Sequence, residues 1–219
     1  MLRIYVIGFI IIVSIIAQIC FAFENNDFQY WNSETISGKL TDTWTADIEQ
    51  GFRFGNDASD FYHQYSDLGF TCPGLTDWFK FGINYRLVFE ESNDEWNYEN
   101  RPHLNAILQY NIHGFKLSNR SRLEYRDKES GDDGWRYRNK FSIKIPIKIT
   151  RFEIQPYAAE EFFIDFNIKQ INRNRLYSGF AFKITKKLSG EIFYLRQSTE
   201  SSDRWTDYNI LGTKLRLSF

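Results

Sequence analysis

Apolar and polar residues alternate along most of the chain, which is the pattern of β-strands with one apolar face. The segment DWFKFGINYRLVFE (77–90) shows the alternation most clearly. One face of it carries Phe79, Phe81, Ile83, Tyr85, Leu87 and Phe89, and the other carries Lys80, Gly82, Asn84, Arg86 and Glu90. No window keeps the 3.6-residue apolar stripe of an amphipathic helix for long. The pattern therefore predicts an all-β protein.

Ten such segments fill the chain from residue 43 to its end. We predict strands near 43–54, 61–71, 77–90, 102–112, 115–127, 135–145, 151–163, 174–184, 190–198 and 208–219. Short links alternate with longer polar ones, such as ESNDEWNYEN (91–100) and DKESGDDG (127–134). A weaker candidate strand lies at 28–36. No linker or low-complexity tract divides these segments, so we expect one domain.

Alternation by itself fits two kinds of barrel. A soluble barrel turns its apolar face inward, whereas a transmembrane barrel turns that face to lipid and its polar face to the lumen. Strands of about 10–13 residues are long enough to cross a membrane at a tilt. Short and long links alternate as periplasmic turns and extracellular loops do. Trp44, Trp78, Trp135 and Tyr208 lie at strand ends, where interfacial aromatic girdles form.

We therefore predict a transmembrane up-and-down antiparallel β-barrel of about ten strands. An even count suits bacterial barrels, because both termini then lie on the periplasmic side. Segment 28–36 would be a periplasmic or lumen-inserted leader. A hairpin in that segment would raise the count to twelve.

The beginning of the chain has the form of a secretory signal peptide. Arg3 precedes an apolar run, IYVIGFIIIVSIIA (4–17), and QICFA leads to Phe23. We expect cleavage after Ala22, which gives a signal peptide at 1–22 and one barrel domain at 23–219. The alternative is a membrane anchor, but the run is short for one and no cationic flank follows it.

The end of the chain, GTKLRLSF, resembles the signal read by the outer-membrane barrel assembly machinery. Its spacing is set by Gly212, Leu215, Leu217 and the terminal Phe219. The alternative is an amphipathic edge strand that happens to end in phenylalanine. With the signal peptide, this ending predicts a monomer in the outer membrane, in contact with membrane lipid and lipopolysaccharide.

Several short motifs resemble one family. They are DFQYW (27–31), IEQGFRF (48–54), RPH (101–103), RSRLEYR (120–126), WRYRNKFSIKIP (135–146), AEEFF (159–163) and RNRLYSGFAF (173–182). Together they are similar to the Gram-negative outer-membrane β-barrel proteins of domain-of-unknown-function family 2490. The resemblance implies a fold and the outer membrane of a Gram-negative bacterium. It implies no reaction and no catalytic residue.

Composition excludes some functions. The chain has 27 Lys and Arg against 28 Asp and Glu, and without Arg3 the balance is 26 against 28, or about −2. Such a chain is no polycation, so nucleic acid is not an expected partner. Cys20 lies in the expected signal peptide, and Cys72 is the only cysteine after it. The mature chain would therefore have no internal disulfide.

Alternate positions of a strand point to opposite faces, so the odd or even position of a residue, its parity, predicts whether it faces lipid or the lumen. Parity predicts a basic lumen. Its cations include Arg53, Arg86, Arg120, Arg122, Arg126, Arg136, Arg138, Lys140 and Arg175, and its acids include Glu49, Glu124, Glu153 and Glu161. Most other acids fall in the long links. Pairing across the turns would bring Glu124 near Arg138, Arg126 near Arg136, Lys144 near Glu153 and Arg136 near Glu161.

Two interpretations of this lumen stay open. It could attract small anionic solutes, as charged rings in pores do, in a passive channel or binding site. It could instead be an internal network that fills a narrow barrel, which would make the protein a closed structural barrel.

A lipid-modifying enzyme is a further alternative, which the sequence does not favour. His63, His103 and His113 show no Ser–His motif, and no G-x-S-x-G elbow is present. Three scattered histidines and one cysteine form no zinc pattern, so we expect no metal and no cofactor.

Overall fold

The computed structural model describes residues 27–74, 76–92, 95–201 and 204–219. The signal peptide expected at 1–22 lies outside the described residues. The described chain is all β, and none of it forms a helix that is long and apolar enough to cross a membrane.

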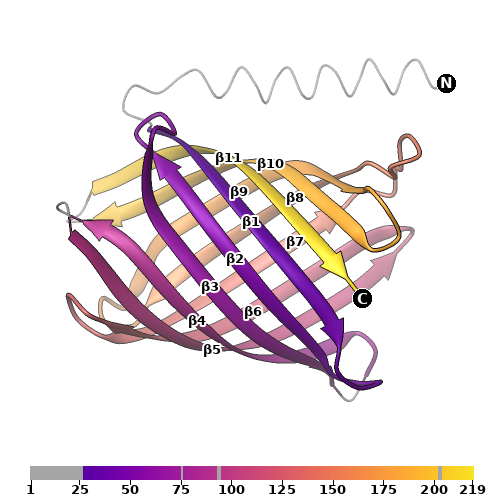
Figure 1. The fold of residues 1–219 in the computed structure, drawn as a ribbon, viewed down its shortest axis with the longest axis horizontal. Helices are drawn as coiled ribbons and strands as arrows, with labels where there is room; N and C mark the ends of the chain where they lie inside the picture. The colour runs from indigo at the N-terminus through magenta and orange to yellow at the C-terminus, as the bar shows by residue number, and fades with distance from the viewer. Residues whose placement is uncertain (1–26, 75, 93–94, 202–203) are drawn as a thin grey trace.

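The strands wind into a closed barrel (Figure 1). They are β1 (Phe28–Lys39), β2 (Thr45–Gly55), β3 (Asp60–Pro73), β4 (Phe79–Ser92), β5 (Glu95–Ile112), β6 (Phe115–Lys128), β7 (Gly134–Lys144), β8 (Gln155–Asp165), β9 (Gln170–Lys183), β10 (Leu188–Ser201) and β11 (Arg204–Ser218). Each strand pairs antiparallel with the next one along the chain. The predicted up-and-down barrel is confirmed.

The barrel has eleven strands, close to the predicted count of about ten. The additional one is β1, so segment 28–36 is part of the wall and not a leader or a hairpin. Parallel pairing of β1 with β11, from Phe28↔Asn209 to Ser37↔Ser218, closes the barrel. An odd number of antiparallel strands makes the first and last run in the same direction. Asp27 and Phe219 therefore lie at opposite ends.

The link that joins β5 to β6 has only two residues, His113 and Gly114, with φ of 49° and 86°. Two successive positive φ values are typical of a type I′ hairpin. The long polar link expected at 91–100 is mostly strand, because β4 continues to Ser92 and β5 begins at Glu95, whereas residues 129–133 do form a link between β6 and β7 within the expected 127–134. The prediction for 91–100 is wrong. The longest link between described strands is 145–154, where the predicted strands left only residues 146–150 between them.

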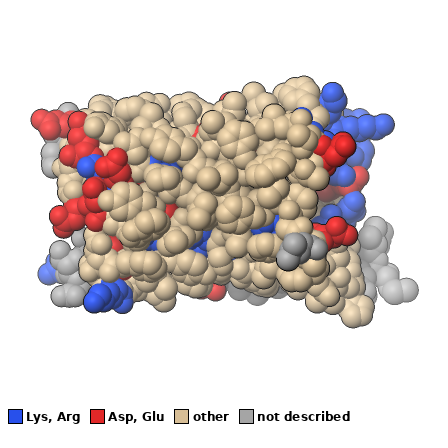
Figure 2. Space-filling model, turned by 90° about the horizontal axis from the view of Figure 1, so that it is seen from below, with Lys and Arg blue, Asp and Glu red and all other residues tan. Residues whose placement is uncertain are grey.

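The two ends of the barrel differ in charge. We call the end that holds Phe219 and links 40–44, 74–78, 113–114, 145–154 and 184–187 the basic end, and the opposite end the acidic end. Figure 2 shows a face whose middle is mostly uncharged, with mainly acidic side chains at the end where β2 and β4 finish and mainly basic ones at the other. The acids expected in the long links account for the acidic end.

The outer wall is apolar. Exposed outward side chains include Ile48, Leu68, Ile83, Leu104, Leu176 and Ile192. Five tryptophans are exposed near the ends of strands: Trp44 and Trp78 at the basic end, and Trp96, Trp135 and Trp205 at the acidic end. An apolar band between two aromatic girdles is the wall of a membrane-spanning barrel.

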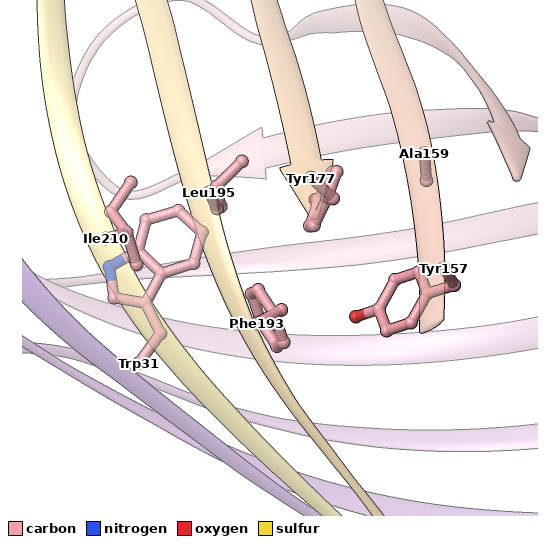
Figure 3. Close-up of a cluster of buried hydrophobic side chains, with 7 residues drawn as sticks. All are labelled: Trp31, Tyr157, Ala159, Tyr177, Phe193, Leu195 and Ile210. Carbon is pink, nitrogen blue, oxygen red and sulfur yellow. The ribbon is translucent and has the colours of Figure 1, made fainter. Parts of the chain in front are cut away.

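One side of the bore is lined by apolar side chains. Figure 3 shows this cluster, which comes from β1 and from β8 to β11: Trp31, Tyr157, Ala159, Tyr177, Phe193, Leu195 and Ile210. Gly212 faces the same side, and a Cβ there would overlap the Phe193 ring. This close approach explains the glycine in the carboxy-terminal spacing. Leu215 and Phe219 are exposed, and the Phe219 N–H donates to the Ser37 carbonyl oxygen at 2.9 Å.

Candidate functional site

The structure places on the inner side of the wall all the basic residues that parity assigned there. Arg86, Arg122, Arg136, Arg138 and Arg175 are buried. Arg53, Arg120 and Lys140 line a cavity inside the barrel, and Arg126 pairs with the buried Glu99. Alternation fixes this outcome, because successive side chains of a strand point to opposite faces.

Glu161, on β8, is the first of two buried carboxylates that hold these arginines. Its side chain is 1% exposed. Arg138 Nη2 donates to Oε1 at 2.8 Å and Arg120 Nη2 at 3.0 Å. The Tyr177 hydroxyl donates to Oε2 at 3.0 Å, and Arg175 Nη1 lies 3.6 Å from the same oxygen. One buried negative charge is thus shared by three guanidinium groups.

Glu124, on β6, is the second, and it is fully buried. It pairs with Arg136, while Arg138 Nη1 lies 3.4 Å from Oε2 and Arg122 Nη1 lies 3.9 Å from it. The contact predicted between Glu124 and Arg138 is therefore present. Arg138 reaches both glutamates and joins the two clusters into what we call the interior charge network.

Three of the predicted pairs, Arg126 with Arg136, Lys144 with Glu153 and Arg136 with Glu161, are wrong in register. The 145–154 link is longer than the turn expected at 146–150, which shifts β8 along β7. Lys140 consequently lies opposite Glu161, and Lys144 lies opposite Tyr157. Glu124, and not Arg126, lies opposite Arg136. The length of each link sets the register of its own hairpin, so an error in one link displaces every predicted pair of that hairpin.

Glu153 lies apart from the interior charge network. It is in the 145–154 link at the basic end, where it pairs with Lys148 at 2.5 Å and Lys183 at 3.2 Å. Hydrogen bonds from these lysines lower the pKa of Glu153 below its ordinary value of 4.5. Both partners are more than half exposed, so this cluster belongs to the rim.

Sequence reasoning missed several acids of the interior. Asp67, on β3, accepts from Arg86 Nε at 2.6 Å and lies 3.6 Å from His103 Nε2. Glu99, on β5, is held by Arg126 through two hydrogen bonds of 2.8 and 2.7 Å. Asp67 has the parity of the inward His63, which could have identified it. Glu99 fell in a segment interpreted as a loop, where parity has no meaning.

Phe163 lies inside the barrel among several arginines. Its ring is 1% exposed and lies on β8 one inward position nearer the acidic end than Glu161. Four guanidinium carbons surround the ring centroid, those of Arg138 at 4.5 Å, Arg175 at 4.7 Å, Arg136 at 5.4 Å and Arg173 at 5.6 Å. Cation–π attraction stabilises such an arrangement. With Glu124 and Arg136 it packs the bore between the centre and the acidic end.

A cavity of about 140 Å³ lies on the other side of this packing; we call it the central cavity. Its charged lining is Arg53, Arg86, Arg120, Arg122, Arg138, Lys140, Arg175 and Lys214, eight cations, with Glu49 and Glu161, two acids. A space of this size accepts a few waters or one small anion.

Two of these cations have no carboxylate partner. Arg53 stacks over Trp31 at 3.9 Å from the ring centroid, and Lys140 lies 3.6 Å from the centroid of the Tyr177 ring. Neither forms an ion pair with a carboxylate of the described residues. Within the described residues, both side chains therefore line the central cavity without a direct ion pair to a carboxylate.

A larger hollow of about 480 Å³, which we call the vestibule, opens at the basic end. Its charged lining is Lys116, Lys144, Lys148, Lys183, Glu153 and Glu191. Basic side chains thus extend from the rim of the barrel toward the central cavity.

The family follows from sequence comparison. The profile of one family matches residues 28–209, from the first residue of β1 into β11. The chain belongs to the family described as Protein of unknown function (DUF2490). The resemblance carried by the short motifs is confirmed. The family description names no activity for the DUF2490 barrel.

Among solved structures, the DUF2490 barrel is similar to the crystal structure of the beta domain of the Bordetella autotransporter BrkA. The two share 13% identity over 76% of this chain and 79% of that chain, with a TM-score of 0.46. Comparison with curated proteins gives no match.

Proposed function

We propose that this protein is an outer-membrane barrel that binds small oxyanions, carboxylates or phosphates, in its central cavity. The observation that carries the proposal is the charge of that cavity, with eight cationic and two acidic side chains around about 140 Å³. Arginine suits such ligands because its planar fork donates two parallel hydrogen bonds to a carboxylate or phosphate.

The apolar wall and the two aromatic girdles support a location in the outer membrane of a Gram-negative bacterium. The chain would arrive through its signal peptide and be inserted as a monomer among lipids and lipopolysaccharide. Recognition of its carboxy-terminal residues by the assembly machinery would leave Phe219 and the basic end on the periplasmic side. Anions would then enter from the periplasm through the vestibule.

Binding suits the interior better than free passage. Phe163, its four arginines and the Glu124 cluster occupy the bore between the central cavity and the acidic end. A pocket that opens on one side gives no large conductance. The same packing favours a second candidate, a closed structural barrel in which the network serves only to fill the bore.

Phosphate binding separates these candidates. Titration calorimetry of the refolded barrel with sodium phosphate should detect binding, and Arg53→Gln and Lys140→Gln should each weaken it about tenfold or more, since a hydrogen bond to a charged group contributes about 1.5–3 kcal/mol. Neither residue pairs with a carboxylate, so the barrel should still fold. Lys148→Gln, at the exposed rim, is the matched control and should change little.

Two results would overturn the proposal. If the folded barrel binds neither phosphate nor acetate, the second candidate, the closed structural barrel, is favoured. A large conductance without ion preference in planar bilayers would show an open pore in place of a pocket.

A further inference from the structure

Glu191, on β10, lies where the vestibule and the central cavity meet. Its carboxylate lines the vestibule. Oε1 lies 3.3 Å from Nζ of Lys144, which also lines the vestibule, and Oε2 lies 3.8 Å from Nζ of Lys214, which lines the central cavity. One carboxylate therefore bridges a cation of each space.

The contacts of Glu191 are looser than those of the buried glutamates. Its side chain is 27% exposed, and those of Lys144 and Lys214 are 34% and 41% exposed. The Tyr157 hydroxyl donates to Oε2 at 3.3 Å. By contrast, Glu161 is 1% exposed and accepts charged hydrogen bonds of 2.8 and 3.0 Å. Long ion pairs that water can reach contribute little and exchange readily.

We infer that Glu191 is a gate, an internal carboxylate that competes with incoming anions for Lys144 and Lys214. An anion bound in the central cavity competes with this carboxylate for Lys214 and is repelled by its negative charge. Both effects lower the affinity for every anion, and the repulsion grows with the charge of the ligand. Glu191 thus favours singly charged over doubly charged anions. The inference rests on the proposed anion site.

Glu191→Gln tests the gate with almost no change in shape. The amide can still accept from Tyr157, but it carries no charge to attract the lysines. In calorimetric titration at pH 8, phosphate, which is mostly doubly charged there, should bind about tenfold more tightly to this variant than to the unchanged protein. Acetate should gain less. Glu191→Asp keeps the charge and should leave both affinities within about threefold.

The matched control is Glu153→Gln. Glu153 also lines the vestibule and also pairs with two lysines, but those lysines are Lys148 and Lys183 at the rim. This variant should change phosphate affinity less than twofold. Retention of the folded barrel is checked for each variant by its heat-dependent shift on SDS gels.

The outcomes separate the two claims. If the unchanged protein binds phosphate and Glu191→Gln leaves that affinity unaltered or lowers it, the gate is overturned and the anion site stands. An equal gain in phosphate affinity for Glu153→Gln also overturns the gate, because the effect would then not depend on the position of Glu191. If none of the folded proteins binds phosphate or acetate, the proposed function fails and the gate fails with it.

Discussion

Replacing Glu161 by glutamine removes the charge that three arginines share. The side chain is 1% exposed, and Arg138, Arg120 and Arg175 approach it to 2.8, 3.0 and 3.6 Å. The amide has nearly the same shape and keeps one acceptor oxygen. The change is therefore electrostatic, and it leaves three neighbouring cations with less compensation in the barrel interior.

The expected cost follows from that burial. Removing one partner of a buried ion pair costs about 3–5 kcal/mol, since the remaining charge is left uncompensated. The retained hydrogen-bond acceptor and the nearby Glu124, which also contacts Arg138 at 3.4 Å, place the estimate for Glu161→Gln at the lower limit, about 3 kcal/mol. With a urea dependence of about 2 kcal/mol per molar, the unfolding midpoint should fall by about 1.5 M.

Urea unfolding in lipid vesicles, followed by tryptophan fluorescence, measures this shift. The matched control is Glu160→Gln, the same substitution one residue earlier. Glu160 is exposed on the outer side and accepts from Asn174 at 3.0 Å, so its loss should change the free energy of unfolding by less than about 0.5 kcal/mol. Equal midpoints for the two variants, or a stabilised Glu161→Gln protein, would refute the reasoning that Glu161 holds the arginines in place.

Three further outcomes are expected. Phe163→Ala empties the most crowded part of the bore; it should cost about 3–5 kcal/mol and raise the conductance in planar bilayers, and an unchanged conductance would show that the ring does not close the bore. Leu104→Arg places a cation on the outer wall and should cost about 2–4 kcal/mol in vesicles if that wall faces lipid; a cost near zero would contradict a membrane wall. The pKa of Glu153 is lowered by Lys148 and Lys183, so its stabilising contribution is complete above pH 4.5 and is lost as the pH falls through the folded-state pKa. Unfolding curves of the unchanged protein and Glu153→Gln should therefore converge in acid, and a difference that persists there would have another cause.

The strands that the sequence predicts best are those with a continuous apolar face. In β4, an apolar residue occupies every second position from Phe79 to Phe89, and the strand lies within two residues of its predicted bounds. β1 is harder to recognise, because Asn32 and Glu34 interrupt its outward face and its inward face is polar at most positions, with small residues from Ser33 to Ser37. Only its pairing with β2 and β11 makes it a strand.

The inward direction of the arginines could likewise be read from the sequence, whereas their partners could not. Parity needs only the alternation of side chains along a strand, so it placed Arg120, Arg122 and Arg138 inside. Partners depend on register, which the length of each link sets. Glu191 illustrates the limit, since it meets Lys144 across the bore, 47 residues earlier in the chain.

The sequence by itself determined an all-β chain with an apolar outer face and a basic inner one. These properties follow from local alternation, which each strand carries independently of the others. The tertiary structure decided the eleventh strand, the parallel closure, the pairing of each carboxylate and the cavity that the cations enclose. Those features require residues far apart in the chain to meet, and only closure of the whole sheet brings them together.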